Sequence, residues 1–128
     1  MAKRILNIVN SAYRATLEEQ DDTIVWLTHA MRAANGQVAL LLQGNAIGYA
    51  GRNQDASGLR FGERCQTRPP RLAEDLTKLL EKGVHVFYVS DDAAERGIES
   101  RELIDGIEAL DRSKLPRLFA EYDQIFHW

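Results

Sequence analysis

The sequence has little cysteine, no long apolar run and no large excess of charge, and each shortage excludes a class of protein. Cys65 is the only cysteine in 128 residues, so no internal disulfide can form. No apolar run approaches the roughly 20 residues that span a bilayer, which predicts no membrane-embedded segment. A net charge of −3 gives no overall reason to expect nucleic acid or an anionic membrane as a partner.

The amino terminus and the overall composition predict one cytoplasmic domain. Residues 1–4 are followed by only five mostly apolar positions, too few for the core of a signal peptide. With a lone cysteine, this favours a reducing cytoplasm. The chain has the usual length of one domain, 45% of its residues are hydrophobic, and it contains no internal repeat, so we expect a single domain over 1–128.

Short, nearly continuous apolar segments predict the strands of a sheet that is covered on both faces. They are too short for typical helices and too uniformly apolar for a strand with one face in water. The predicted strands are Ile5–Val9, Val38–Leu42, Val84–Val89, Ile107–Leu110 and Gln124–Trp128.

Helical spacing of apolar residues fills the segments between these strands. The predicted helices cover about 18–34, 46–50, 72–80, 92–97, 101–104 and 113–119, with Ser90, Asp91 and Asp92 offering caps. Strands that alternate with helices imply parallel pairing through right-handed crossovers. The predicted class is therefore α/β, with a mostly parallel five-stranded sheet between helical layers.

Small or polar residues stand where the first three strands end. They are Asn10 and Ser11, Gly44 and Asn45, and Ser90 and Asp91. Ligands of parallel sheets bind beyond the carboxyl ends of the strands, so Asn10, Ser11, Asn45, Ser90 and Asp91 are candidate binding residues. The alternative is that they only cap helices and form turns.

Residues 51–70 form a long insert without clear periodicity, and such loops are often functional. The insert and its border hold Arg52, Arg60, Arg64, Arg68 and Arg71, with Cys65 among them. Guanidinium groups beside a thiol favour the reactive thiolate, so Cys65 is a candidate nucleophile or sulfur carrier. We expect this loop to lie near the strand ends. Alternatively, Cys65 is a small apolar plug or an incidental thiol, and Arg64 and Arg68 bind an anion or a partner's carboxylates.

Other residue types give no comparable pattern. His29, His85 and His127 lack ligand spacing, so we predict no metal site. There is no glycine-rich dinucleotide fingerprint and no phosphate-binding loop of the Walker type, and we expect no cofactor. Trp26 and Trp128 are predicted to belong to the core rather than to a base-stacking surface.

Several segments carry a resemblance to a known family. The segments Val86–Val89 and Asp92–Ile98, then Leu103–Ile107 and Leu118–Trp128, are similar to a pattern of strand, "D-x-x-A-R-G-L", short helix and closing "ITW". Val9–Tyr13 and Leu41–Ile47 are similar to "TVNKSPF" and "LLxxDAV". These segments resemble the DsrE/DsrF/DsrH-like family of sulfur-relay proteins, and its DsrH/TusB branch most. The resemblance leaves out the 51–70 insert.

The resemblance implies a flavodoxin-like, three-layer α/β/α domain that assembles with copies or relatives of itself. Some branches pass persulfide sulfur between proteins. The cysteines of those branches are absent here, because Val89 or Ser90 and Trp26 occupy the aligned positions. A carrier role would therefore have to use Cys65.

These observations leave three hypotheses for function. The first is a protein of sulfur metabolism, either a non-catalytic subunit or a persulfide carrier with a sulfur donor or acceptor protein as partner. The second is a small-anion or nucleotide-binding module that uses the arginines of the insert. The third is a pure protein-interaction subunit.

Overall fold

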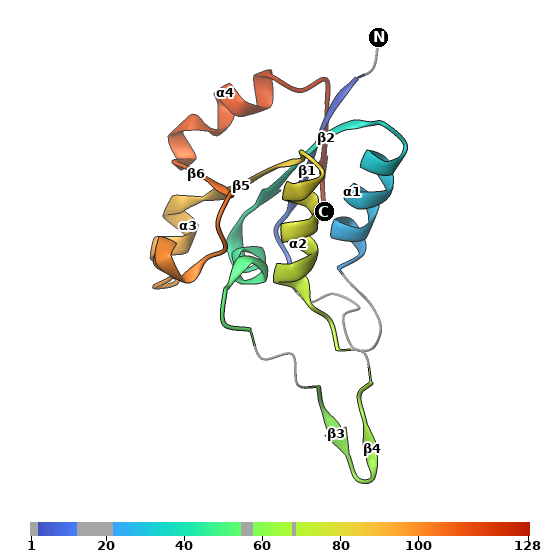
Figure 1. Cartoon of the computed structure of the whole chain (residues 1–128). Helices are drawn as coiled ribbons and strands as arrows, with labels where there is room; N and C mark the ends of the chain where they lie inside the picture. Colours follow the sequence, from blue (N-terminus) through green and yellow to red (C-terminus); the bar gives the residue numbers. More distant parts are fainter. Residues whose placement is uncertain (1–2, 13–21, 55–57, 68) are drawn as a thin grey trace.

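The computed structural model describes residues 3–12, 22–54, 58–67 and 69–128 (Figure 1). Its centre is a five-stranded sheet in which every pair of neighbours is parallel. The sheet order is β6-β5-β2-β1-β7, and the strands are β1 (Arg4–Val9), β2 (Gln37–Leu42), β5 (His85–Val89), β6 (Glu108–Leu110) and β7 (Gln124–His127). The predicted α/β class and parallel sheet are confirmed.

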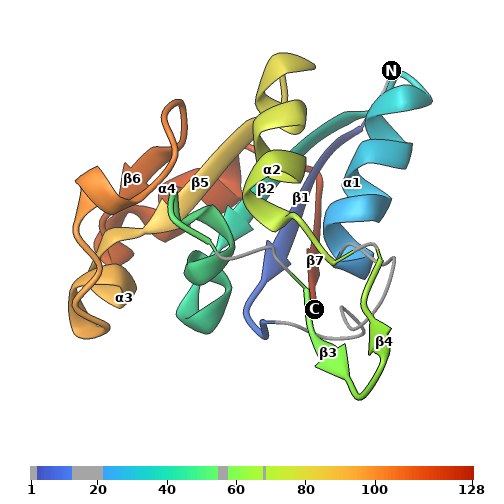
Figure 2. The same ribbon diagram turned by 60° about the horizontal axis from the view of Figure 1, so that its bottom comes forward.

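The order of the strands places the helices on two faces. From β1 through β2 and β5 to β6 the chain steps in one direction, and right-handed crossovers put the connecting helices on one side. The final step from β6 to β7 goes back past β1, so its helix covers the opposite face (Figure 2). The helices are α1 (Thr23–Ala33), α2 (Leu72–Glu81), α3 (Ser90–Glu95) and α4 (Leu115–Ala120).

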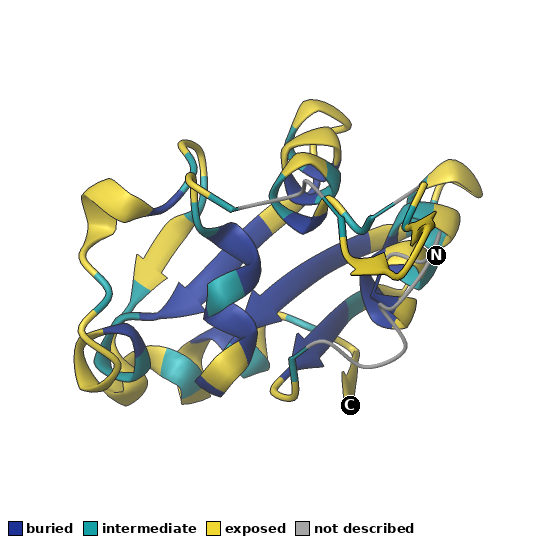
Figure 3. Cartoon of the chain, turned by 90° about the horizontal axis from the view of Figure 1, so that it is seen from below, coloured by how far each residue is buried: buried dark blue, intermediate teal, exposed yellow. Residues whose placement is uncertain are grey.

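The two faces of the sheet have cores of different size. Alternation along β2 directs Val38, Leu40 and Leu42 toward α1 and α2, and Ala39 and Leu41 toward α4. The α1–α2 side holds the larger cluster of buried residues, while on the α4 side Leu118 packs over a smaller one. Figure 3 shows that burial is concentrated in the central strands and falls toward the periphery.

Several boundaries differ from the sequence-based predictions. The segment predicted as a helix near 46–50 is a 3-10 helix, η1 (Gly44–Ala50), and the turn near 101 is η2 (Ser100–Glu102); a third, η3 (Arg112–Lys114), precedes α4. The predicted start of the first helix near residue 18 lies outside the described residues, and α1 begins after the N-cap Asp22. The insert contains an antiparallel hairpin that was not predicted, β3 (Arg60–Phe61) and β4 (Arg64–Cys65).

The prediction that both tryptophans belong to the core is wrong. Trp26 is 59% exposed and Trp128 is 40% exposed. The inward face of α1 is made by Ile24, Val25 and Thr28, which turns Trp26 outward. Trp128 follows β7, an edge strand whose residues are all exposed. In the described part of the chain, no helix has the length and apolarity needed to cross a membrane.

Candidate functional site

The start of η1, just after β2, is tied to α3 by a glycine and an aspartate. The Gly44 N–H donates to Asp92 Oδ2 at 2.8 Å. Gly44 has φ +58°, and a Cβ there would lie 2.5 Å from Asn10 Oδ1 and 3.3 Å from the Asn10 carbonyl oxygen. The site therefore favours glycine for its backbone angle, and any added side chain would also have to displace the side chain of Asn10.

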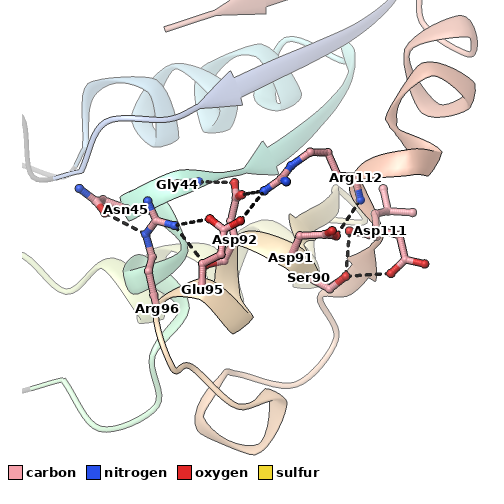
Figure 4. Close-up of polar contacts among 10 residues, drawn as sticks. Gly44, Asn45, Ser90, Asp91, Asp92, Glu95, Arg96, Asp111 and Arg112 are labelled. Carbon is pink, nitrogen blue, oxygen red and sulfur yellow. Dashed lines mark hydrogen bonds and ion pairs between the residues drawn. The ribbon is translucent and has the colours of Figure 1, made fainter.

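Arg112 joins η3 to the same aspartate. Its guanidinium donates to Asp92 Oδ1 at 2.5 Å and to Glu95 Oε1 at 3.2 Å, and its backbone N–H donates to Asp91 Oδ1 at 2.8 Å (Figure 4). Burial acts to raise the pKa of the Asp92 carboxyl, but the hydrogen bonds from Gly44 and Arg112 outweigh it and lower that pKa below its ordinary value. Asp92 is thus held as a carboxylate between two donors.

Arg96 and Ser90 complete the polar contacts at this edge. Arg96 Nε donates to Asn45 Oδ1 at 2.9 Å, and its Nη1 donates to the Asp92 carbonyl at 3.1 Å. Ser90 Oγ lies 3.2 Å from the Leu110 carbonyl oxygen and 3.1 Å from a carboxylate oxygen of Asp111. Ser90 is the first residue of α3, whose N-cap is Val89 without a side-chain cap bond, so the predicted capping by Ser90, Asp91 or Asp92 is wrong.

We call these residues the strand-end network: Gly44, Asn45, Ser90, Asp91, Asp92, Glu95, Arg96, Asp111 and Arg112. Its guanidinium groups donate to carboxylate, amide and carbonyl oxygens, and its carboxylates accept hydrogen bonds from Gly44, Ser90 and Arg112, so its geometry is suited to holding η1, α3 and η3 together. Among the described residues, no group of three or more histidine, cysteine, aspartate or glutamate side chains is placed to hold a metal ion.

The hairpin of the insert, unlike the strand-end network, consists of two exposed strands. Two-residue strands pair Arg60 with Cys65 and Phe61 with Arg64, and Gly62 takes φ +63° in the turn. The thiol of Cys65 is exposed and free. Figures 1 and 2 show the hairpin leaving the carboxyl edge of the sheet and extending away from it.

The structure brings together only part of the predicted site. Asn45, Ser90 and Asp91 belong to the strand-end network, Asn10 contacts Gly44 beside it, and Ser11 is an exposed neighbour of Asn10. Arg64 and Cys65 lie on the hairpin, and among the described residues no hydrogen bond or ion pair joins them to the network. Arg68 lies outside the described residues.

Arg52 is also not part of a shared basic surface. Its guanidinium pairs with Asp105 and donates to the Arg101 carbonyl, which ties the start of the insert to η2. Of the arginines described within the insert, Arg60 and Arg64 remain on the hairpin.

Sequence reasoning missed Asp92, Arg96 and Arg112 as parts of the site. The sequence does hold a signal for two of them. Asp92 and Arg96 are four residues apart, one helical turn, and both belong to the "D-x-x-A-R-G-L" segment. Nothing local pointed to Arg112, which reaches Asp92 from 20 residues away.

Comparison with known proteins supports the fold and leaves the chemistry open. No family model matches the chain, and no curated protein matches it in sequence. The crystal structure of the ychN protein from E. coli superposes with a TM-score of 0.72 at 21% identity, covering 98% of this chain and 99% of that chain. The whole chain shares that fold. A protein of unknown function from Methanobacterium thermoautotrophicum, MTH1491, superposes with a TM-score of 0.62 at 13% identity, covering 97% and 98%.

Proposed function

We propose that the chain is a DsrE/F/H-like protein that carries persulfide sulfur on Cys65. The observation that carries this proposal is the placement of the sole thiol: it is exposed on a hairpin that extends from the body, with Arg64 beside it and Arg60 opposite it. The whole-chain likeness in fold to the ychN protein is consistent with the family resemblance.

Cys65 is the only thiol in the sequence, so the proposed carrier role falls to it. The position at the end of β5, where the DsrE/TusD branch has its cysteine, is Val89 or Ser90 here. Val89 is buried, and the Ser90 hydroxyl is engaged with Leu110 and Asp111. A hydroxyl is not a persulfide carrier, and the sequence holds no second thiol.

The transfer itself needs no redox partner. The Cys65 thiolate attacks the outer sulfur of a donor persulfide, R–S–SH. A sulfur–sulfur bond forms to Cys65 as the donor's sulfur–sulfur bond breaks, and the donor leaves as the thiolate R–S⁻. The product is Cys65–S–SH. Arg60 and Arg64 supply positive charge near the attacking thiolate.

The resembling segment has a structural explanation of its own. Asp92 and Arg96 of the "D-x-x-A-R-G-L" segment hold the turn after β2 through Gly44 and Asn45. These residues therefore support the domain, and the proposed chemistry belongs to the hairpin. This division makes the carrier proposal testable without disturbing the fold.

The test uses the full chain incubated with a cysteine desulfurase and cysteine, followed by intact-protein mass spectrometry. We expect a gain of one sulfur atom that is removed by reductant and absent in Cys65→Ser. Ser90→Ala is the matched control, since it changes the family's carrier position, and it should load normally. If the wild-type thiol remains unmodified while the desulfurase itself bears persulfide, the carrier proposal is wrong.

A non-catalytic assembly subunit is the second candidate, and exposed apolar side chains favour it. Leu59 and Phe61 on the hairpin are 53% and 64% exposed, and Ile125, Phe126 and Trp128 at edge strand β7 are each at least 40% exposed. Edge strands and apolar patches of this kind are common interaction surfaces. Sedimentation velocity together with the sulfur-loading test distinguishes the candidates, because a pure assembly subunit associates with copies or relatives but gains no sulfur on Cys65.

A further inference from the structure

A groove lies on the α4 face of the sheet, away from Cys65. Since only the last crossover uses this face, the six-residue α4 is the only α-helix described there, and it leaves β5 and β6 partly uncovered. The groove between α4 and these two strands has a volume of about 320 Å³. That is within the size range of pockets for small molecules, at its lower end.

The groove has an apolar floor and an aromatic platform. Phe87 and Leu118, which are 7% and 6% exposed, line it. The rings of His85 and Phe87 stack at 6.1 Å between centroids and 16° between planes. Leu110 of β6 adds to the apolar lining. A flat ring or a short hydrocarbon fits against such a surface.

One wall of the groove carries cations without partners. Lys114, Arg117 and Glu121 recur at helical spacing and face the groove together with Leu118. Within the described part of the chain, the side chains of Lys114 and Arg117 make no hydrogen bond or ion pair. Unpaired cations beside an apolar floor favour a ligand that joins an anionic group to an apolar body.

At the other end of the groove carboxylates outnumber guanidinium groups, since Glu108 and Glu121 lie there with Arg4. Glu108 lies 3.8 Å from His85 Nδ1, and the Arg4 guanidinium lies 5.0 Å from the centre of the Tyr122 ring. Glu121, the C-cap of α4, also lines the groove. The free positive charge is thus at Lys114 and Arg117, next to the carboxyl end of β6, which sets the orientation of a bound anion.

We infer that this groove binds a small amphipathic organic anion, with its carboxylate or sulfonate at Lys114 and Arg117 and its apolar part over Phe87 and Leu118. The site is independent of the proposed sulfur chemistry. Cys65 lies on the hairpin, which extends from the carboxyl edge of the sheet, whereas the groove lies on the α4 face (Figure 1). The volume admits a ligand of one or two rings.

The test uses 5-dimethylaminonaphthalene-1-sulfonate, a two-ring aromatic sulfonate whose fluorescence rises in apolar sites. Titration into the full chain should saturate at one molecule per chain. Amide NMR shifts should centre on residues of β5, β6 and α4. Arg117→Ala should weaken binding about tenfold, the effect of losing one charge-assisted contact of about 1.4 kcal/mol.

Two control variants keep the result interpretable. Arg101→Ala removes the same charge from an exposed arginine outside the groove and should leave affinity unchanged. Cys65→Ser should also bind normally, so failure of the sulfur proposal would not affect this one. NMR shifts centred on β7 or the hairpin, an equal loss in Arg101→Ala, or no saturable binding would each overturn the inference.

Discussion

The strand-end network and the hairpin are both rich in charged residues, but they use their charges in opposite ways. In the network, Arg112 and Arg96 are bonded to Asp92, Glu95 and Asn45. On the hairpin, Arg60 and Arg64 flank an exposed thiol and an exposed phenylalanine. Arginine content alone therefore does not identify a reactive surface. What distinguishes the two is whether the fold supplies partners for the charges.

The comparison also separates stability from chemistry. The network links η1, α3 and η3, and the Asp92 side chain is only 16% exposed, so its contacts are made when the domain folds. The hairpin contributes no residue to either buried core cluster. Substitutions in the network should therefore change the free energy of unfolding, whereas substitutions on the hairpin should change reactivity and association.

The largest expected effect is that of Gly44→Ala. An alanine would have to adopt φ +58° and place its Cβ 2.5 Å from Asn10 Oδ1. Backbone strain and the clash together should lower the free energy of unfolding by about 2–3 kcal/mol. Urea denaturation monitored by circular dichroism measures this change.

Gly62→Ala is the matched control on the hairpin. Its φ of +63° is almost the same, but nothing lies within 4 Å of the added Cβ. Strain confined to the hairpin should leave the global unfolding transition nearly unchanged. Equal losses for the two variants would contradict the claim that the two regions differ in their coupling to the core.

Asp92→Asn should cost less and should depend on pH. Loss of the charge-assisted bond to Arg112 should lower the free energy of unfolding by about 1–2 kcal/mol near neutral pH. Because folding lowers the pKa of Asp92, the stabilisation is fully present above the unfolded value of about 3.9 and is lost as pH falls through the folded value. The difference from wild type should thus shrink below about pH 4.

Asp105→Asn is the control for that measurement. Asp105 also pairs with an arginine, Arg52, but its side chain is 90% exposed. Exposed pairs contribute little, so this variant should match wild type across the pH range. A constant deficit of Asp92→Asn down to pH 2–3 would mean that the carboxylate is not what stabilises the edge.

The sequence predicts the central sheet well because its evidence is local. Continuous apolar runs such as Val38–Leu42 and Val84–Val89 require burial on both faces, and their alternation with helical segments implies parallel pairing. The hairpin gave no such evidence. Its strands have two residues each, and Gly62-Glu63 is a less specific turn than Asn-Gly or Asp-Gly.

The candidate site was predictable only in part for a related reason. Strand ends can be located from the sequence, so Asn45, Ser90 and Asp91 could be placed at one edge of the sheet, where the structure has them. The partners of these residues come from another part of the chain, and the contact between Arg112 and Asp92 exists only after folding. The burial of Trp26 was predicted wrongly because large aromatic residues are usually buried. In the structure, Ile24, Val25 and Thr28 form the inward face of α1, and Trp26 lies on its exposed side.

Arg64→Gln should have a smaller effect, on reactivity alone. Arg64 is the chain neighbour of Cys65, and its positive charge attracts an anionic reagent, so losing it should slow alkylation of Cys65 by iodoacetate about two- to threefold at low salt, the range expected for exposed charges. Arg101→Gln removes a charge away from the hairpin and should not change the rate. An unchanged alkylation rate in Arg64→Gln would show that Arg64 does not affect the reactivity of Cys65.

The smallest expected effect on stability is that of Phe61→Ser. Phe61 is 64% exposed and belongs to neither core cluster, so the free energy of unfolding should stay within about 0.5 kcal/mol of wild type. Removing an exposed ring from an interaction surface should instead weaken association, which sedimentation velocity of the two proteins at matched concentrations would detect. A large loss of stability would show that the hairpin packs on the body in solution. The strand-end network and the hairpin would then not differ in their coupling to the core.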